Sequence, residues 1–202
     1  LGTDHIWLSL ILIVVALAAF PGIPRGQTPL VLAPLFQDHA VIQRGRPTPI
    51  WGTAGAGDEV SVAFAGRQAT ARADASGRWT VTLPAMAAGG PHSLEVRTTS
   101  GATMTLSDIL VGDVFLCSGQ SNMEFGVAQS RGGEFVATRS ANDRIRLLTI
   151  AHAAASQPAA AFEKAPAWQS AGPQSLRTFS AACYFFGRDV HEEEGRVRLH
   201  VD

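Results

Sequence analysis

The chain has 202 residues, of which 46% are hydrophobic and 16% are charged. This length suits one sizeable domain or two small ones, and the composition excludes a disordered chain. The net charge of −1, with the histidines taken as neutral, gives no reason to expect nucleic acid or an anionic surface as a partner.

An uninterrupted apolar stretch occupies residues 6–20 and is followed by a Pro- and Gly-rich turn. As a helix it would rise only about 22 Å, less than the ~30 Å hydrocarbon core of a membrane. This length is typical of a signal peptide, and the small residues at 16–18 suit signal peptidase. We therefore predict that residues 1–28 are a signal peptide and that the protein is exported, to the periplasm or the extracellular space. The alternative is an uncleaved N-terminal anchor, and we expect a membrane contact only in that case.

Residues 29–107 have the pattern of short strands that end in Gly, Pro or Asp. The runs are "HAVIQRG", "TPIWGTA", "DEVSVAFAG", "RQATARAD", "GRWTVTLP" and "HSLEVRTT". Apolar and polar residues alternate clearly at 60–64 and 79–83. Many short strands without a helical period between them predict a small antiparallel β-sandwich. Residues 86–92 are predicted to be a loop, and Trp51 and Trp79 are expected in the core.

The pattern changes at Ile109, where an apolar run of the kind found in doubly covered parallel strands begins. A weakly helical segment, a second β-like run at 144–150 and a polar connection follow. Residues 176–194 then read as an amphipathic helix. Its expected apolar face consists of Phe179, Ala182, Cys183, Phe186 and Val190. Strand, helix, strand and helix in this order are the start of an α/β layer, which we assign to residues 108–202.

Cys117 and Cys183 are the two cysteines of the chain, and each lies in an apolar run. An exported protein could pair them, but these runs fit two buried free thiols equally well. We expect them to be unpaired. Neither has companions at metal-ligand spacing, and we expect no metal and no organic cofactor.

Ser121 has two interpretations. The run Ser121-Asn122-Met123-Glu124 matches the S-x-x-E capping box of an ordinary helix start. A serine placed where a buried parallel strand turns into a helix also stands at the sheet edge where open α/β folds bind ligands. Gly119 permits a sharp turn there, and free N–H groups at a helix start suit an oxyanion. The pattern is not the G-x-S-x-G elbow, because Met123 stands where that motif needs glycine.

The stretch "ILVGDVFLCSGQSNMEF" (109–125) resembles the first catalytic block of the sialate O-acetylesterase family, which belongs to the SGNH hydrolases. "PLFQDHAVIQRGRPTPIWGTAGAGDEVSVAF" and "ADASGRWTVTLPAMAAGGPHSLEV" are similar to the β-sandwich that precedes the hydrolase domain in bacterial members. "NDRIRLLTI" and "AWQSAGPQSLRTFSAACYFFGRDVHEE" resemble the next strand and helix of the family. The resemblance extends over about residues 30–194.

This resemblance implies an N-terminal antiparallel β-sandwich followed by the first portion of an SGNH-type three-layer α/β hydrolase domain. It implies that Ser121 is the acyl-accepting nucleophile and that its N–H is an oxyanion donor. Gly119, Gln120 and Asn122 take oxyanion or supporting roles. The implied reaction is hydrolysis of acetyl esters on a carbohydrate, with sialic acid as the family's named substrate.

Other parts of the family's machinery have no match in this chain. They include a later glycine, an amide-bearing oxyanion residue, and an Asp and a His near the far end of the hydrolase domain. The segment 195–202 is charged and departs from the family's next parallel strand, so we interpret the chain as truncated and expect little or no esterase activity. Asp189 and His191 point to different sides of a helix, and His152 only starts a polar connection. No histidine can be named as the general base.

Two alternatives stay open. The first is an esterase of the same superfamily that acts on acetyl xylan or another glycan. The second is a non-catalytic carbohydrate-binding or structural sandwich with an inert hydrolase remnant. Trp168, in the polar connection, is placed near the rim of the active site.

Overall fold

The computed structural model describes residues 29–154, 156–157, 161–194 and 199–201, so the predicted signal peptide or anchor at 1–28 lies outside the described residues. The strands are β1 (Val31–Leu32), β2 (Val41–Gln43), β3 (Thr48–Thr53), β4 (Glu59–Phe64), β5 (Arg67–Arg72), β6 (Arg78–Leu83), β7 (Gly89–Thr98), β8 (Thr103–Phe115), β9 (Asn142–Leu147), β10 (Gln169–Ala171) and β11 (Leu199–Val201). The helices are α1 (Ser121–Glu124), the 3-10 helix η1 (Val127–Gln129), α2 (Gly133–Thr138) and α3 (Ala181–Glu194). The described part of the chain is therefore mostly β with few helices. None of the helices in it is both long and apolar enough to span a membrane.

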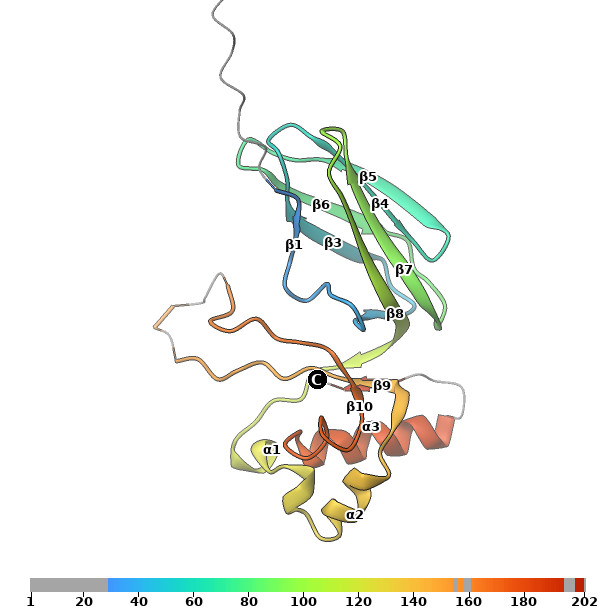
Figure 1. Cartoon of the computed structure of the whole chain (residues 1–202), viewed down its shortest axis with the longest axis vertical. Helices are drawn as coiled ribbons and strands as arrows, with labels where there is room; N and C mark the ends of the chain where they lie inside the picture. Colours follow the sequence, from blue (N-terminus) through green and yellow to red (C-terminus); the bar gives the residue numbers. More distant parts are fainter. Residues whose placement is uncertain (1–28, 155, 158–160, 195–198, 202) are drawn as a thin grey trace, which may run out of the picture.

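The upper part of the molecule in Figure 1 is built from short antiparallel strands. Each of the six predicted runs contains one strand, from β2 to β7. β1, β3 and β6 form one sheet, and β4, β5, β7 and β8 belong to a larger one. Strict alternation in β4 and β6 buries every second residue, because successive side chains of a strand point to opposite faces. The predicted loop at 86–92 is shorter than expected, since β7 begins at Gly89, which pairs with Val111.

β8 connects the upper and lower parts of the molecule (Figure 1). This strand is 13 residues long and runs through the predicted boundary between residues 107 and 108. It pairs antiparallel with β7 and parallel with β2, and its last residues pair parallel with β11. The larger sheet therefore has the continuous order β10-β9-β11-β8-β7-β4-β5. The lower part of the molecule extends the same sheet that the upper part begins.

β11 follows α3 and lies between β8 and β9, parallel to both. The expectation that residues 195–202 depart from a parallel strand is therefore wrong for 199–201. The helix carries the chain back along the sheet, as a parallel crossover requires, and this return brings the backbone of 199–201 between two strands. Leu199 pairs with Asp113, and Val201 pairs with Leu147.

Two hydrophobic clusters fill the interior. The first lies between the two sheets of the upper part and includes Ile50, Val60, Val62, Phe64, Trp79, Val81, Leu83, Leu94 and Val96. It also takes in Leu148 and Trp168, which follow β9 in the sequence. The second cluster packs α3 and η1 against β9 and β10 and consists of Val127, Ile145, Leu147, Ala171, Leu176, Phe179, Ala181, Cys183 and Tyr184. The segment after β9 thus belongs to the core of the upper part.

The tryptophan predictions are borne out at one of three positions. Trp79 is buried, as predicted. Trp51 is 39% exposed and packs edge-to-face on Phe36, because its neighbour Ile50 takes the inward position in β3. Trp168 is buried and donates from Nε1 to the carbonyl oxygen of Leu35 at 2.9 Å. Its predicted place at an active-site rim is therefore wrong.

The apolar face of α3 agrees only in part with the predicted one. Cys183 is buried as predicted, as is Phe179 before the helix, but Ala182 and Phe186 are exposed, and Ala181 and Tyr184 are buried in addition. The buried stripe of the helix consists of residues 181, 184 and 187. These positions have the spacing of three residues that places them on one helical face. Phe186 lies beside this stripe and packs edge-to-face on Phe115, at the end of β8.

Candidate active site

The site predicted around Ser121 lies where parallel strands end. β8, β11 and β9 run in the same direction, so their carboxyl ends meet at one edge of the sheet. Residues 116–120 leave β8 at this edge and lead into α1, which begins at Ser121. Ligands of open α/β sheets bind at such an edge. The prediction that Ser121 follows a buried strand and starts a helix is confirmed.

A cleft with a volume of about 460 Å³ opens at this edge. Its walls come from three segments that follow β8, follow β9 and precede α3. They are lined by Leu116, Cys117, Ser118, Gly119, Met123, Glu124, Leu148, Thr149, Ile150, Ala151, His152, Thr178, Phe179 and Ser180. Gly119 is thus the predicted site residue that lines the cleft. Gln120, Ser121 and Asn122 are exposed between Gly119 and Met123, beside the lining residues.

Ser121 does not cap the helix. It is the first residue of α1, and the N-cap position is taken by Gln120, whose side chain makes no capping hydrogen bond. The predicted capping box is therefore not formed. Among the described residues, the hydroxyl of Ser121 has no hydrogen-bond partner, and Ser121 is exposed. The helix itself has only four residues, so no stabilisation of an oxyanion by a helix dipole is inferred.

The turn before Ser121 is closely packed on the helix that follows it. A Cβ atom at Gly119 would stand 2.7 Å from Cγ of Met123, closer than two non-bonded carbon atoms approach. The amide N–H of Met123 donates to the carbonyl oxygen of Gln120 at 2.8 Å. Glycine at 119 thus leaves room for the Met123 side chain, whereas its φ is not positive, so the turn does not depend on the conformational freedom of glycine.

Glu124 and His152 meet across the cleft. Oε1 of Glu124, the last residue of α1, lies 3.0 Å from Nδ1 of His152, in the segment after β9. Both side chains are exposed, at 58% and 80% respectively. Sequence reasoning gave His152 no place in the site. The available signal was its position five residues after the end of β9, which is at the same sheet edge as Ser121.

Two other histidines have neighbours away from the cleft. His39 contacts Asp108 at 2.6 Å, and His92 packs edge-to-face on Phe64. Asp189, which lies two residues before His191, accepts two hydrogen bonds from Arg188. His152 is the histidine among the lining residues of the cleft.

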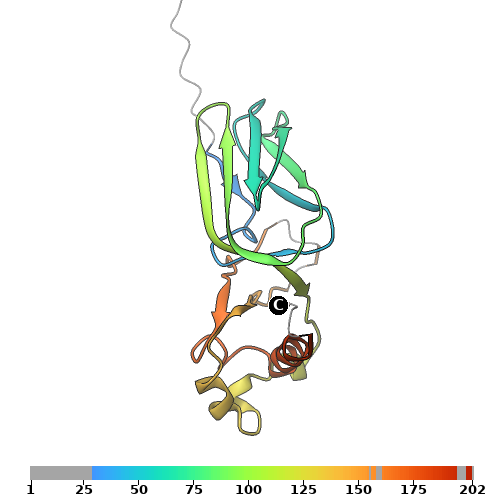
Figure 2. The same ribbon diagram turned by 90° about the vertical axis from the view of Figure 1, so that its right-hand side faces the viewer.

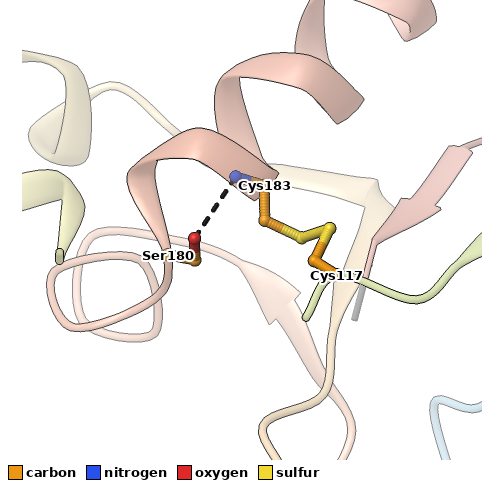
Figure 3. The surroundings of a disulfide bond; sticks show 3 residues. All are labelled: Cys117, Ser180 and Cys183. Atoms are coloured by element: carbon orange, nitrogen blue, oxygen red, sulfur yellow. Dashed lines mark hydrogen bonds between the residues drawn. A yellow bond between two sulfur atoms is a disulfide. The ribbon is translucent and has the colours of Figure 1, made fainter. Parts of the chain in front are cut away.

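Cys117 and Cys183 form a disulfide, with Cα atoms 6.0 Å apart, so the expectation that they are unpaired is wrong. Cys117 lies two residues after β8 and lines the cleft. Cys183 lies in the first turn of α3 and is buried. Figure 3 shows the two segments side by side, with the hydroxyl of Ser180 accepting a hydrogen bond from the amide of Cys183 at 3.3 Å. The apolar runs around both cysteines pack at the same end of the sheet, which brings the thiols together.

The pKa values of two groups are shifted, one beside the disulfide and one in the first half of β8. Burial raises the pKa of Tyr184, the neighbour of Cys183 in the second hydrophobic cluster. The hydrogen bond from Arg146 lowers the pKa of Asp108, which also contacts His39. Within the described ranges, His, Cys, Asp and Glu residues form no group of three or more that could hold a metal ion.

Comparison with known proteins places the chain beside carbohydrate esterases. No family model matches the sequence. It is 27% identical over 175 residues to the sialate O-acetylesterase of Rattus norvegicus and 32% identical over 131 residues to that of Homo sapiens. These matches cover 78% and 58% of this chain, but only 32% and 24% of the two relatives. The chain therefore spans about a third or less of the length of the curated relatives it matches.

A solved structure of a carbohydrate acetylesterase from Xanthomonas citri has the same arrangement over most of this chain. Its TM-score is 0.80 with 36% sequence identity, over 85% of this chain and 39% of that protein. The match includes residues of both the upper and the lower part, since 85% of 202 residues cannot be contained in either part alone.

Proposed function

We propose that the chain is related to the sialate O-acetylesterases and takes part in the hydrolysis of acetyl esters on carbohydrates, with Ser121 as nucleophile; its similarity to these enzymes and to the carbohydrate acetylesterase structure supports this. The observation that carries this proposal is the position of Ser121. It is exposed, follows a strand at the carboxyl edge of a parallel sheet, and adjoins a cleft of about 460 Å³. A cleft of this size is sufficient for a sugar with its acetyl group.

In the proposed reaction, Oγ of Ser121 attacks the carbonyl carbon of the acetyl ester and gives up its proton. The bond between the acetyl carbon and the sugar oxygen then breaks, and the sugar leaves with a proton as an alcohol. Water hydrolyses the acetyl-serine, releases acetate and restores the hydroxyl. The amides of Gly119 and Ser121 are the proposed donors to the oxyanion, and Gln120 and Asn122 support the substrate from either side of the serine.

The test is to trap the acetyl group on the protein. The 202-residue chain is mixed with p-nitrophenyl acetate or an acetylated sugar and quenched in acid, and its peptides are examined by mass spectrometry. We expect an acetyl group on the peptide that contains Ser121, and its loss in Ser121→Ala. Ser118→Ala is the matched variant, because Ser118 lines the same cleft three residues earlier. Loss of the acetyl group in Ser118→Ala alone would move the nucleophile to Ser118.

The sugar itself is the second point to be tested. The structural relative is a carbohydrate acetylesterase, which favours comparing O-acetylated sialic acid with neutral acetylated glycans such as acetyl xylan. Release of acetate from each substrate is measured with the wild-type chain and with Ser121→Ala. Glycan binding that survives Ser121→Ala, without acetylation of any serine, would instead support a carbohydrate-binding module.

We further propose that residues 29–107 are a β-sandwich domain and that residues 108–202 are a portion of an SGNH-type three-layer α/β hydrolase domain. The two facing sheets of the upper part support the first assignment, and the parallel strands β8, β11 and β9 with α3 support the second. β8 is shared by both (Figures 1 and 2). Limited proteolysis tests this division. A stable fragment that ends near residue 107 would support it, because β8 would then have been cut without unfolding the sandwich.

Export to the periplasm or the extracellular space is also a proposal. The Cys117–Cys183 disulfide supports it, because such bonds form and persist in oxidising compartments. Fractionation of cells that express the chain tests it, with mass spectrometry of the N-terminus to decide between cleavage near residue 28 and an uncleaved anchor.

A further inference from the structure

The segment that carries Ser121 is held firmly on its C-terminal side. Residues 125–128 run beside residues 177–181, just before and at the start of α3. Gly126 and Ser180 form an antiparallel β-bridge. Three backbone hydrogen bonds join the same segments: the amide of Ala181 to Phe125 O at 2.8 Å, that of Val127 to Phe179 O at 3.0 Å, and that of Ala128 to Arg177 O at 3.1 Å.

The N-terminal side of the segment has no such bonds. β8 ends at Phe115, and Leu116, Ser118, Gly119 and Gln120 are all exposed. Outside the sheet, the backbone hydrogen bond that involves residues 116–120 is the local one from Met123 to Gln120. After Phe115, which pairs with Val201 and packs on Phe186, the disulfide of Cys117 is the next link to another segment.

The two ends of the disulfide differ in their surroundings. Cys183 is 1% exposed and lies in the first turn of a helix whose neighbours Ala181 and Tyr184 are buried in the second hydrophobic cluster. Cys117 is half-buried and lines the cleft. The helix is therefore the fixed partner, and the exposed turn before Ser121 is the part that the bond restrains.

We propose that the Cys117–Cys183 disulfide positions the turn that carries Ser121, so that the candidate site depends on the oxidation state of this pair. This inference rests on the proposed function of Ser121. In the oxidised protein the turn is held at both ends, by the disulfide and by the bridge at Gly126. Reduction by an added phosphine consumes one water molecule: the S–S bond breaks to give two thiols whose hydrogens come from the water, and the oxygen of the water converts the phosphine to its oxide. Between the end of β8 at Phe115 and Ser121, the turn then has no covalent link to α3.

Hydrogen–deuterium exchange measures this restraint without requiring any turnover. Exchange is followed by mass spectrometry in the oxidised chain, the phosphine-reduced chain and Cys183→Ser. We expect the hydrogen-bonded amide of Met123, within the peptide 116–124, to exchange at least tenfold faster when the bond is absent, with β4 and β6 unchanged. Unchanged exchange in 116–124 would overturn the proposal. Equal acceleration in 116–124 and in β4 and β6 would also overturn it, because the bond would then stabilise the whole fold rather than position one turn.

Ser180→Ala is the matched control for this experiment. It removes the hydroxyl that accepts from the amide of Cys183 in the same turn of α3 and leaves the disulfide in place (Figure 3). We expect exchange in 116–124 to stay within twofold of the wild type in this variant. Acceleration as large as in Cys183→Ser would assign the restraint to the helix start and not to the disulfide.

The functional consequence is measured by the rate at which Ser121 is acetylated by p-nitrophenyl acetate. We expect this rate to fall at least tenfold on reduction and to return on reoxidation. The substrate concentration that gives half the maximal rate should change less than the maximal rate itself. Absence of acetylation in the oxidised chain would contradict the proposed function and leave the exchange result to decide the positioning role. Equal acetylation rates in both redox states would overturn the positioning role alone.

Discussion

Arg146 and Asp108 form a two-point ion pair at the junction between the upper and lower parts of the sheet. Nη1 and Nη2 of Arg146, on β9, donate to Oδ2 and Oδ1 of Asp108, on β8, at 2.8 Å and 3.0 Å. Arg146 is 2% exposed, and Asp108 is 33% exposed. The Nε atom of Arg146 also donates to the carbonyl oxygen of Asp143. The pair thereby fixes β9, whose carboxyl end leads into one wall of the cleft.

We expect Arg146→Met to lower the free energy of unfolding substantially. Removing one partner of a buried ion pair typically costs 3–5 kcal/mol, and because Asp108 keeps partial access to water we expect about 2–3 kcal/mol. Urea unfolding at neutral pH measures this. Arg97→Met is the matched control, because Arg97 pairs with Glu95 at the surface and its loss should change stability by less than about 1 kcal/mol. Equal effects of the two substitutions would contradict a structural role for the Arg146–Asp108 pair.

The same pair predicts how stability depends on pH. The hydrogen bond from Arg146, followed by that from His39, holds the pKa of Asp108 below its ordinary value of 3.8. A carboxyl group whose pKa is lowered on folding stabilises the folded protein above its unfolded pKa, and this contribution disappears as the pH falls through the folded pKa. We expect the stability difference between the wild type and Asp108→Asn to be constant above roughly pH 5 and to shrink below roughly pH 4. Asparagine is the suitable replacement, since Asp108 has a φ of 55° and asparagine tolerates that region. A difference that does not change between neutral and acid pH would show that another group is responsible.

The alternating strands were predictable because their signal is local. In β4 and β6 every second residue is apolar, and those residues are the buried ones. The strand-to-helix turn at Ser121 was predictable for the same reason. By contrast, the 3–4 spacing around Phe186 did not show which side of α3 faces the sheet, because Phe186 is apolar yet packs at the rim on Phe115.

The features that were not predicted correctly from the sequence depend on contacts between residues far apart in the chain. Cys117 and Cys183 are 66 positions apart, and their apolar surroundings are the same whether the thiols are free or paired. Arg146 lies in an apolar run, but its burial depends on Asp108, 38 positions earlier. His152 follows β9 in a stretch without any periodic pattern, and its meeting with Glu124 results from the way the strands are ordered in the sheet.

Trp168 links the segment before β10 to the upper part of the molecule. Its ring packs in the first hydrophobic cluster, and its Nε1 donates to the carbonyl oxygen of Leu35. Replacing a buried tryptophan by alanine typically costs 3–5 kcal/mol, and we expect Trp168→Ala to lower the free energy of unfolding by about that amount. Trp51→Ala, at an exposed ring, should cost clearly less. Urea unfolding followed by circular dichroism compares the two, and a larger effect of Trp51→Ala would contradict the burial of Trp168.

The contact between Glu124 and His152 leads us to predict that His152 accepts the proton of Ser121. When Nδ1–H of His152 donates to Oε1 of Glu124, which lies 3.0 Å away, Nε2 keeps its lone pair and is able to accept a proton. General-base assistance typically contributes 10²–10⁴-fold. We expect His152→Ala to slow acetylation of Ser121 by p-nitrophenyl acetate by roughly 10²-fold. Glu124→Gln, which keeps a hydrogen-bond acceptor but removes the charge, should have a smaller effect. His92→Ala is the control, because His92 packs on Phe64 in the upper part of the molecule and should not change the rate. An acetylation rate in His152→Ala equal to that of the wild type would show that Ser121 is activated by a group other than His152.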